Sequence, residues 1–166
     1  MNDRFAVASV RGHSDGQIVR WVLVASLKPL AAEPPLEIGL TEHGQWVVAA
    51  ADGSVVDVQA AENYLPLFPL LELPIDEARD QLKTEFTKRG VNEKWLQLFP
   101  FHDLVAAGLT IRSKSWASLA FRWVENLGPS ETLCAAVDLV RTMGLTQAQR
   151  HEAARVLSAW RRRRKS

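Results

Sequence analysis

The chain has 166 residues, of which 47% are hydrophobic and 23% are charged, and its formal net charge at pH 7 is +1. A chain of this length can bury a core, and its charge content is close to the globular average, so the composition excludes an intrinsically disordered protein. Cys134 is the only cysteine, which excludes an intrachain disulfide and favours a reducing compartment. The longest apolar run, 18–27, contains Arg20 and is shorter than the roughly 18 residues of a membrane-spanning helix. Since the N-terminus also lacks a basic lead into an apolar stretch, we predict a soluble, cytoplasmic protein.

Positive charge is concentrated at the C-terminal end of the sequence. Its five consecutive cations are Arg161, Arg162, Arg163, Arg164 and Lys165. Without them, 15 basic residues face 19 acidic ones, so the first 160 residues carry a formal charge of −4. A mildly acidic body therefore ends in a basic tail, residues 161–166.

The first 60 residues have the period of two and the turn signals of an antiparallel sheet. We expect a short strand at 5–10, a turn at 13–16 and a second short strand at 36–40. A longer strand is expected between the turn at 13–16 and the strand at 36–40. Five of its apolar residues are predicted to share the core-facing side: Val19, Trp21, Leu23, Ala25 and Leu27. A hairpin is predicted over 45–58, where Asp52 and Gly53 supply the two positive-φ positions of a tight turn.

Beyond residue 60 the period changes to that of helices. Residues 65–74 are nearly all apolar, but their prolines block a continuous helix or a central strand, which predicts that 61–74 form a connector between the two halves. A helix is expected over 75–89, where Gly90 ends it, and Asn92 can cap a further one. A short helix is predicted over 104–109 with Asp103 as its N-cap.

Three longer helices follow, each with one apolar stripe. The first ends at Gly128, the second ends at Gly144, and the third opens with the capping-box pattern Thr146 to Gln149. The predicted stripes are Trp116, Leu119, Ala120, Trp123, Val124 and Leu127; Leu133, Val137, Val140 and Met143; and Ala153, Val156, Leu157 and Trp160.

Strands and helices are segregated along the chain, which predicts an α+β fold rather than a doubly wound sheet. We expect an N-terminal antiparallel β-sheet of three to five strands in residues 1–60 and the apolar connector at 61–74. A C-terminal helical bundle-like module over 75–160 and the basic tail at 161–166 complete the chain, and all four parts are predicted to form one compact unit.

Candidate catalytic residues are sparse in the sequence. The neighbours His102 and Asp103 would point about 100° apart on a helix, so they do not form an acid–base pair. The consecutive residues 13–15 cannot adopt the geometry of a hydrolase triad, and Cys134 lies on an apolar stripe that predicts an inert, buried thiol.

Cofactor motifs are equally sparse. His151 begins a zinc-protease pattern whose second histidine is replaced by Arg155, and no glycine-rich phosphate loop occurs. We predict no catalytic residue, no metal and no cofactor. An enzyme whose site combines distant residues such as His43, Asp57 and His102 remains an alternative.

Two features suggest binding. The basic tail, Arg161 to Lys165, can neutralise phosphates of nucleic acid or hold an acidic partner, although no aromatic residue is interleaved to stack on bases. Trp46 opens a predicted hairpin strand and is a candidate for a partly exposed protein-interface residue. Residues 139–150 have a passing similarity to a helix-turn-helix motif, but Arg150 stands where a buried aliphatic residue is usual, which favours an ordinary helical hairpin.

The function that these patterns favour is a non-enzymatic protein-binding or regulatory protein, of the adaptor or immunity type, whose partner is another protein. The first alternative is a nucleic-acid or ribosome-associated protein that uses the arginine-rich tail. The second is the enzyme with a dispersed site. The oligomeric state is left open.

Overall fold

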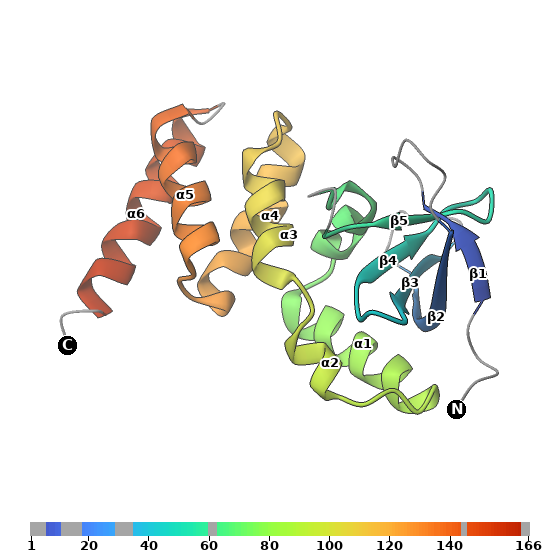
Figure 1. Cartoon of the computed structure of the whole chain (residues 1–166). Helices are drawn as coiled ribbons and strands as arrows, with labels where there is room; N and C mark the ends of the chain where they lie inside the picture. Colours follow the sequence, from blue (N-terminus) through green and yellow to red (C-terminus); the bar gives the residue numbers. More distant parts are fainter. Residues whose placement is uncertain (1–5, 11–17, 29–34, 60–62, 144–145, 164–166) are drawn as a thin grey trace. The chain divides into compact units, whose positions relative to one another are not determined.

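A computed structural model describes residues 6–10, 18–28, 35–59, 63–143 and 146–163 (Figure 1). The chain divides into two compact units, Met1–Phe99 and Pro100–Ser166. The first contains a five-stranded antiparallel sheet with helices α1 and α2, and the second contains four helices. The predicted α+β class is confirmed. Helices α1 and α2, which the sequence analysis groups with the later helices, lie in the same unit as the sheet.

The sheet is a meander in which each strand pairs with the next along the chain. Its strands are β1 (Ala6–Ser9), β2 (Ile18–Leu27), β3 (Leu36–Thr41), β4 (Trp46–Ala49) and β5 (Val55–Asp57). An isolated parallel bridge between Val10 and Val55 brings the end of the first strand to the last one. Because a meander leaves the first and fifth strands parallel, this bridge shows that the sheet curls toward closure. The turn predicted at 13–16 lies outside the described residues.

The five residues predicted to share the core-facing side of β2 do not all lie on one face, although Ala25 and Leu27 are buried as predicted. The pairing with β3 shifts between Leu23 and Ala25, so a bulge interrupts the alternation. Leu23 pairs with Gly39, whereas Ala25 pairs with Ile38, which belongs to the opposite face. An inserted residue moves all later side chains to the other side of the sheet, and this cannot be seen from a regular period of two.

The predicted hairpin between β4 and β5 is present, but its turn is longer than predicted. Ala49 pairs with Val55, the Gly53 N–H donates to the Ala50 carbonyl, and the Ala50 N–H donates to the Ser54 carbonyl. The loop is therefore the three residues 51–53, with Gly53 at a φ of +80°. This is a common three-residue hairpin loop, in which the final glycine takes the left-handed conformation. The Asp52 carboxylate accepts hydrogen bonds from the Ser54 N–H and hydroxyl.

After the sheet, the proline-rich connector contains a 3₁₀ helix, η1 (Leu65–Glu72). Its hydrogen bonds join residues three apart, whereas the predicted effect of the prolines was to exclude a continuous α-helix. Helix α1 (Ile75–Lys88) ends as predicted before Gly90, which has a φ of +65°. The Val91 N–H donates a hydrogen bond to the Phe86 carbonyl and so satisfies one of the last carbonyls of the helix. Helix α2 (Lys94–Gln97) follows with Glu93 at its N-cap, one residue after the predicted Asn92, whose side chain accepts the Lys94 N–H. Helix α1 packs against β2.

The second unit consists of α3 (Phe101–Thr110), α4 (Lys114–Leu127), α5 (Glu131–Met143) and α6 (Gln147–Arg163). Helix α3 packs on α4 and α5, and α6 packs on α5 and α4. The predicted start of α3 is wrong. The helix begins at Phe101, directly after Pro100, so Asp103 lies inside the first turn and not at the N-cap. There its carboxylate favours the helix through the macrodipole.

The predicted capping box of α6 is confirmed. The Gln149 N–H donates to the Thr146 hydroxyl at 3.1 Å, and the Thr146 N–H donates to the Gln149 side-chain oxygen at 3.2 Å. The four residues of the predicted α6 stripe are all buried. On α5 the stripe is buried except for Met143, which is 70% exposed. Among the described helices, none has the length and apolar content needed to cross a membrane.

Candidate functional site

Trp46, the predicted interface residue, belongs to the core of the first unit. Its side chain is only 1% exposed. The indole stacks on Phe86, meets the ring of Phe99 edge-on at 5.0 Å, and donates its N–H to the Leu98 carbonyl at 3.2 Å. The predicted partial exposure is therefore wrong, because helix α1 and the segment after α2 cover the beginning of β4.

Two residues of the dispersed enzyme site, His43 and Asp57, take part in local interactions. His43 is exposed in the β3–β4 turn, 3.9 Å from a carboxylate oxygen of Glu42. Asp57 is buried in β5, where its carboxylate accepts the Gln59 N–H. His102 is half-buried in the first turn of α3, in the other unit. In the described parts of the chain, no three His, Cys, Asp or Glu side chains are grouped as a metal site.

Cys134 is half-buried on α5, between the buried Leu133 and the exposed Ala135. The predicted full burial of its thiol is therefore wrong. The thiol lies at the edge of the apolar stripe rather than on it. The apolar period of a helix identifies the middle of its buried face but does not decide whether a residue at the edge of that face is covered.

The basic tail is partly visible. Arg161, Arg162 and Arg163 are exposed in the last turn of α6, where cations complement the helix dipole. Arg164 and Lys165 lie outside the described residues. One turn and a half earlier, Arg155 donates to Glu152 on its own helix and to Glu125 on α4. These two carboxylates raise the pKa of Arg155 and offset its charge, so it adds little positive potential to the arginines that follow.

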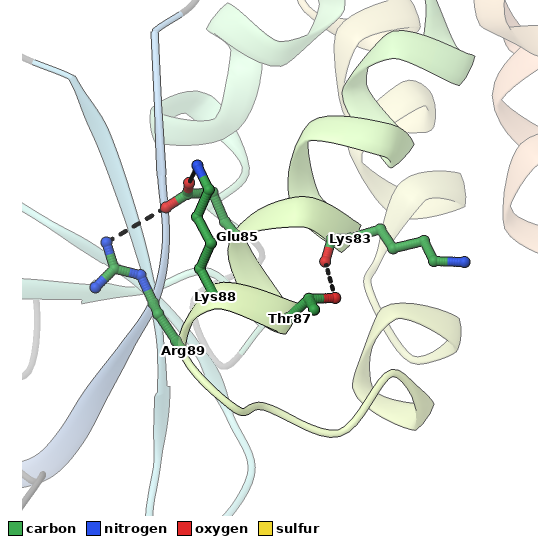
Figure 2. A network of polar contacts seen from close by, with 5 residues as sticks. All are labelled: Lys83, Glu85, Thr87, Lys88 and Arg89. Carbon is green, nitrogen blue, oxygen red and sulfur yellow. Dashed lines mark hydrogen bonds and ion pairs between the residues drawn. The ribbon is translucent and has the colours of Figure 1, made fainter.

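Helix α1 carries a network of polar contacts, shown in Figure 2. Glu85, whose side chain is 14% exposed, accepts hydrogen bonds from Lys88 at 2.7 Å and from Arg89 at 3.4 Å. The bond from Lys88 is the main reason why the pKa of Glu85 lies below its ordinary value. One turn away, the Thr87 hydroxyl donates to the Lys83 carbonyl. These contacts join residues three or four apart, and Glu85 also accepts a hydrogen bond from the backbone of Ser26 on β2, so the network supports α1 and its packing on the sheet.

A hollow of the second unit lies where the ends of its four helices meet, and we call it the helix-end hollow. Its volume is about 460 Å³. Its walls come from the end of α3 and the linker after it, the first turns of α4 and α6, and the last turns of α5. The lining residues are Leu109, Thr110, Ile111, Arg112, Ala117, Leu139, Val140, Met143 and Gln149.

Two apolar side chains stand at the rim of the helix-end hollow. Leu139 is 44% exposed and Met143 is 70% exposed, while Leu109, Ala117 and Val140 are buried and form its floor. The sequence analysis missed this surface. A signal was present, because Leu139 falls off the stripe formed by Leu133, Val137 and Val140 and had no predicted partner.

Polar side chains of the helix-end hollow come from Thr110, Arg112 and Gln149, and the Thr110 hydroxyl donates to the Ala106 carbonyl of its own helix. Gln149 is 6% exposed, and its side-chain oxygen is occupied by the capping bond from Thr146. Among the described residues, no acceptor binds its side-chain NH₂, which can donate two hydrogen bonds. Arg112 is exposed, and no carboxylate of the described chain forms an ion pair with it. The surface thus combines apolar side chains with unused hydrogen-bond donors and contains no acidic lining residue.

Comparisons with known proteins give no relative from which a function can be carried over: no family model, no curated protein and no solved structure matches the chain.

Proposed function

We propose that this chain is a non-enzymatic protein-binding protein of the adaptor or regulatory kind, and that the helix-end hollow is its binding surface. The observation that supports it is the exposure of Leu139 and Met143 beside an apolar floor. Two neighbouring exposed apolar side chains over a concave surface are typical of interaction sites, whereas single exposed ones are ordinary.

A protein partner fits this surface better than a small ligand does. Sites for small molecules bury most of the ligand within concave walls. Here Met143 projects with 70% of its surface exposed and Leu139 with 44%, so both apolar groups lie at the rim rather than around an enclosed space. Covering them requires a surface that extends beyond the hollow, such as that of another polypeptide. Methionine suits such contacts because its flexible side chain adapts to the partner.

Site-specific photo-crosslinking tests the proposal. A photo-reactive phenylalanine analogue replaces Met143 in one variant and Thr132, an exposed residue in the first turn of the same helix, in the matched control. We expect one protein of the host to be linked from position 143 and not from position 132. Once purified, that protein should bind the native chain and lose at least about tenfold in affinity with Leu139→Ser plus Met143→Ser, since each buried apolar side chain contributes about 1.5–3 kcal/mol. Identical crosslinks from both positions would contradict the proposal.

Nucleic-acid binding is the second candidate, and the exposed arginines at the end of α6 favour it. Replacing Arg161, Arg162 and Arg163 by Gln removes three charges while keeping residues that form helices well. Loss of binding to a single-stranded or duplex RNA probe in this variant, with full retention by Met143→Ser, would support the nucleic-acid function. Equal binding by both variants and by the native chain would count against it.

A further inference from the structure

We infer that the partner places an amphipathic helix on the helix-end hollow, with an acidic side chain that contacts Arg112 and the side-chain NH₂ of Gln149. This inference rests on the proposed protein-binding function and specifies the chemistry of the segment that is bound.

The shape of the exposed apolar surface favours a helix. Leu139 and Met143 are four residues apart on α5, so they lie one above the other on the same face of that helix. Rows of side chains four residues apart form the ridges that pack into the grooves of a neighbouring helix. The adjoining part of α5, including Val140, already packs inside the unit, and the row 139–143 is left exposed. A helix from a partner can therefore continue the packing found within the second unit.

The charge around the hollow favours an acidic residue on that helix. Arg112 belongs to the short linker between α3 and α4 and offers up to five N–H donors. Gln149 is only 6% exposed, and its side-chain oxygen accepts the capping bond from Thr146. This bond fixes the position of the side-chain NH₂. Two donors from different segments that line one hollow can be bound by the two oxygens of a carboxylate.

Among the described residues, no carboxylate of the chain itself accepts hydrogen bonds from Arg112 or from the side-chain NH₂ of Gln149. The nearest acidic residue in sequence to the exposed row is Asp138, which is bound to Arg141 at 2.9 Å. A basic partner helix would bring a second positive charge close to Arg112, and no carboxylate lines the hollow to offset the repulsion. A neutral one that offers no acceptor at this position would bury the NH₂ of Gln149 unpaired, and an unsatisfied buried donor is unfavourable. An acidic, amphipathic helix is the segment that satisfies both groups.

Three synthetic helical peptides test the inference with the full-length, isotope-labelled chain. All three carry the same pair of leucines four residues apart, and they differ in a single flanking residue, which is Glu, Gln or Lys. Binding is measured by NMR from the side-chain amide signals of Gln149 and the methyl signal of Met143. We expect the Glu peptide to shift both signals and to bind about tenfold more tightly than the Gln peptide, since hydrogen bonds to a charged acceptor are stronger than those to a neutral one.

Two variants separate the charge from the apolar contact. Arg112→Gln should reduce the preference for Glu over Gln to about twofold or less and leave binding of the Gln peptide unchanged. Arg122→Gln, a matched change at an exposed position of α4, should preserve the preference. In Met143→Ser all three peptides should bind more weakly, and amide spectra of each variant check that the fold is kept.

Several results would overturn the inference. Equal affinity for the Glu and Gln peptides, or absence of any shift at Gln149 and Met143, would show that an acidic helix is not the segment bound. Concentration-dependent shifts of the same signals without peptide would show that a second copy of the chain occupies the hollow. The photo-crosslinking result at position 143 is independent of these outcomes, so failure of the inference can be distinguished from failure of the proposed function.

Discussion

Gly39, in the middle of β3, lies directly under the indole ring of Trp21. A Cβ added at this glycine would lie 2.2 Å from Trp21 Cε3 and 2.8 Å from the Val22 carbonyl oxygen, where ordinary contacts are 3.4–4 Å. The ring must therefore move by more than 1 Å. Trp21 packs on the apolar cluster of the inner sheet face, formed by Ala8, Val10, Val19, Val47 and Val55. We predict that Gly39→Ala displaces this ring and loosens the cluster.

The expected loss of stability follows from the size of the overlap. Adding a methyl group to a packed core destabilises by about 1–3 kcal/mol. Because the backbone oxygen of Val22 also stands in the way, rotating the ring alone cannot relieve the overlap, and the upper half of this range is expected. For a unit of this size, such a loss lowers the melting temperature by about 10 °C or more. Urea and thermal unfolding, followed by tryptophan fluorescence and circular dichroism, measure it.

A double-mutant cycle identifies the cause. In a Trp21→Ala background the ring is absent, so the further loss caused by Gly39→Ala should fall to about 1 kcal/mol or less. Gly53→Ala is the matched control, because its Cβ would meet nothing within 4 Å and its loss of about 1–2 kcal/mol arises from a φ of +80°. That loss should not depend on Trp21. The reasoning is refuted if Gly39→Ala destabilises by less than about 0.5 kcal/mol, or equally in both backgrounds.

Three further outcomes test other parts of the structure. Thr146→Ala should destabilise the chain by about 1 kcal/mol in urea unfolding because α6 loses its cap, whereas the control Thr142→Ala, an exposed hydroxyl that bonds within its own helix, should change stability by less than about 0.5 kcal/mol. Glu85→Gln should lower stability at pH 7 by about 0.3–1 kcal/mol and flatten the pH profile of unfolding; the folded pKa of Glu85 is lowered by Lys88, so its contribution is present above pH 4.5 and disappears as the pH falls through the folded pKa. Trp46→Phe should destabilise by about 1–3 kcal/mol in chemical unfolding, because it opens space in the core and removes the indole hydrogen bond.

Local patterns with a defined geometry were predicted well from the sequence. The pair Thr146 and Gln149 specifies a reciprocal set of hydrogen bonds three residues apart, and both bonds are present. Gly90 and Gly128 end α1 and α4 with φ values of +65° and +74°, which other residues rarely adopt. In these cases the signal and its structural consequence lie within one turn of the chain.

Features that depend on distant neighbours were not predictable in this way. The bulge after Leu23 arises in the pairing of β2 with β3, and the regular alternation of residues within β2 gives no sign of it. Trp46 follows two turn residues, which suggests exposure, yet its burial is decided by Phe86 and Phe99, forty and more residues later. The hairpin turn needed the pairing of Ala49 with Val55 to fix its length, since Asp-Gly occurs in loops of two and of three residues.

The helix-end hollow illustrates why the candidate site could not be found from the sequence. Its lining comes from the ends of four helices and one linker, and each contributes only one to three residues. The period of each helix identifies the face that packs inside the unit, but an exposed apolar residue such as Met143 becomes informative only when the neighbouring floor is known. The arginines of α6 show the opposite case. They are the most conspicuous feature of the sequence, yet Arg155, the cation that precedes them on that helix, is held by two carboxylates. Spatial convergence of unused groups, rather than their prominence in the sequence, therefore directs the binding proposal to the hollow.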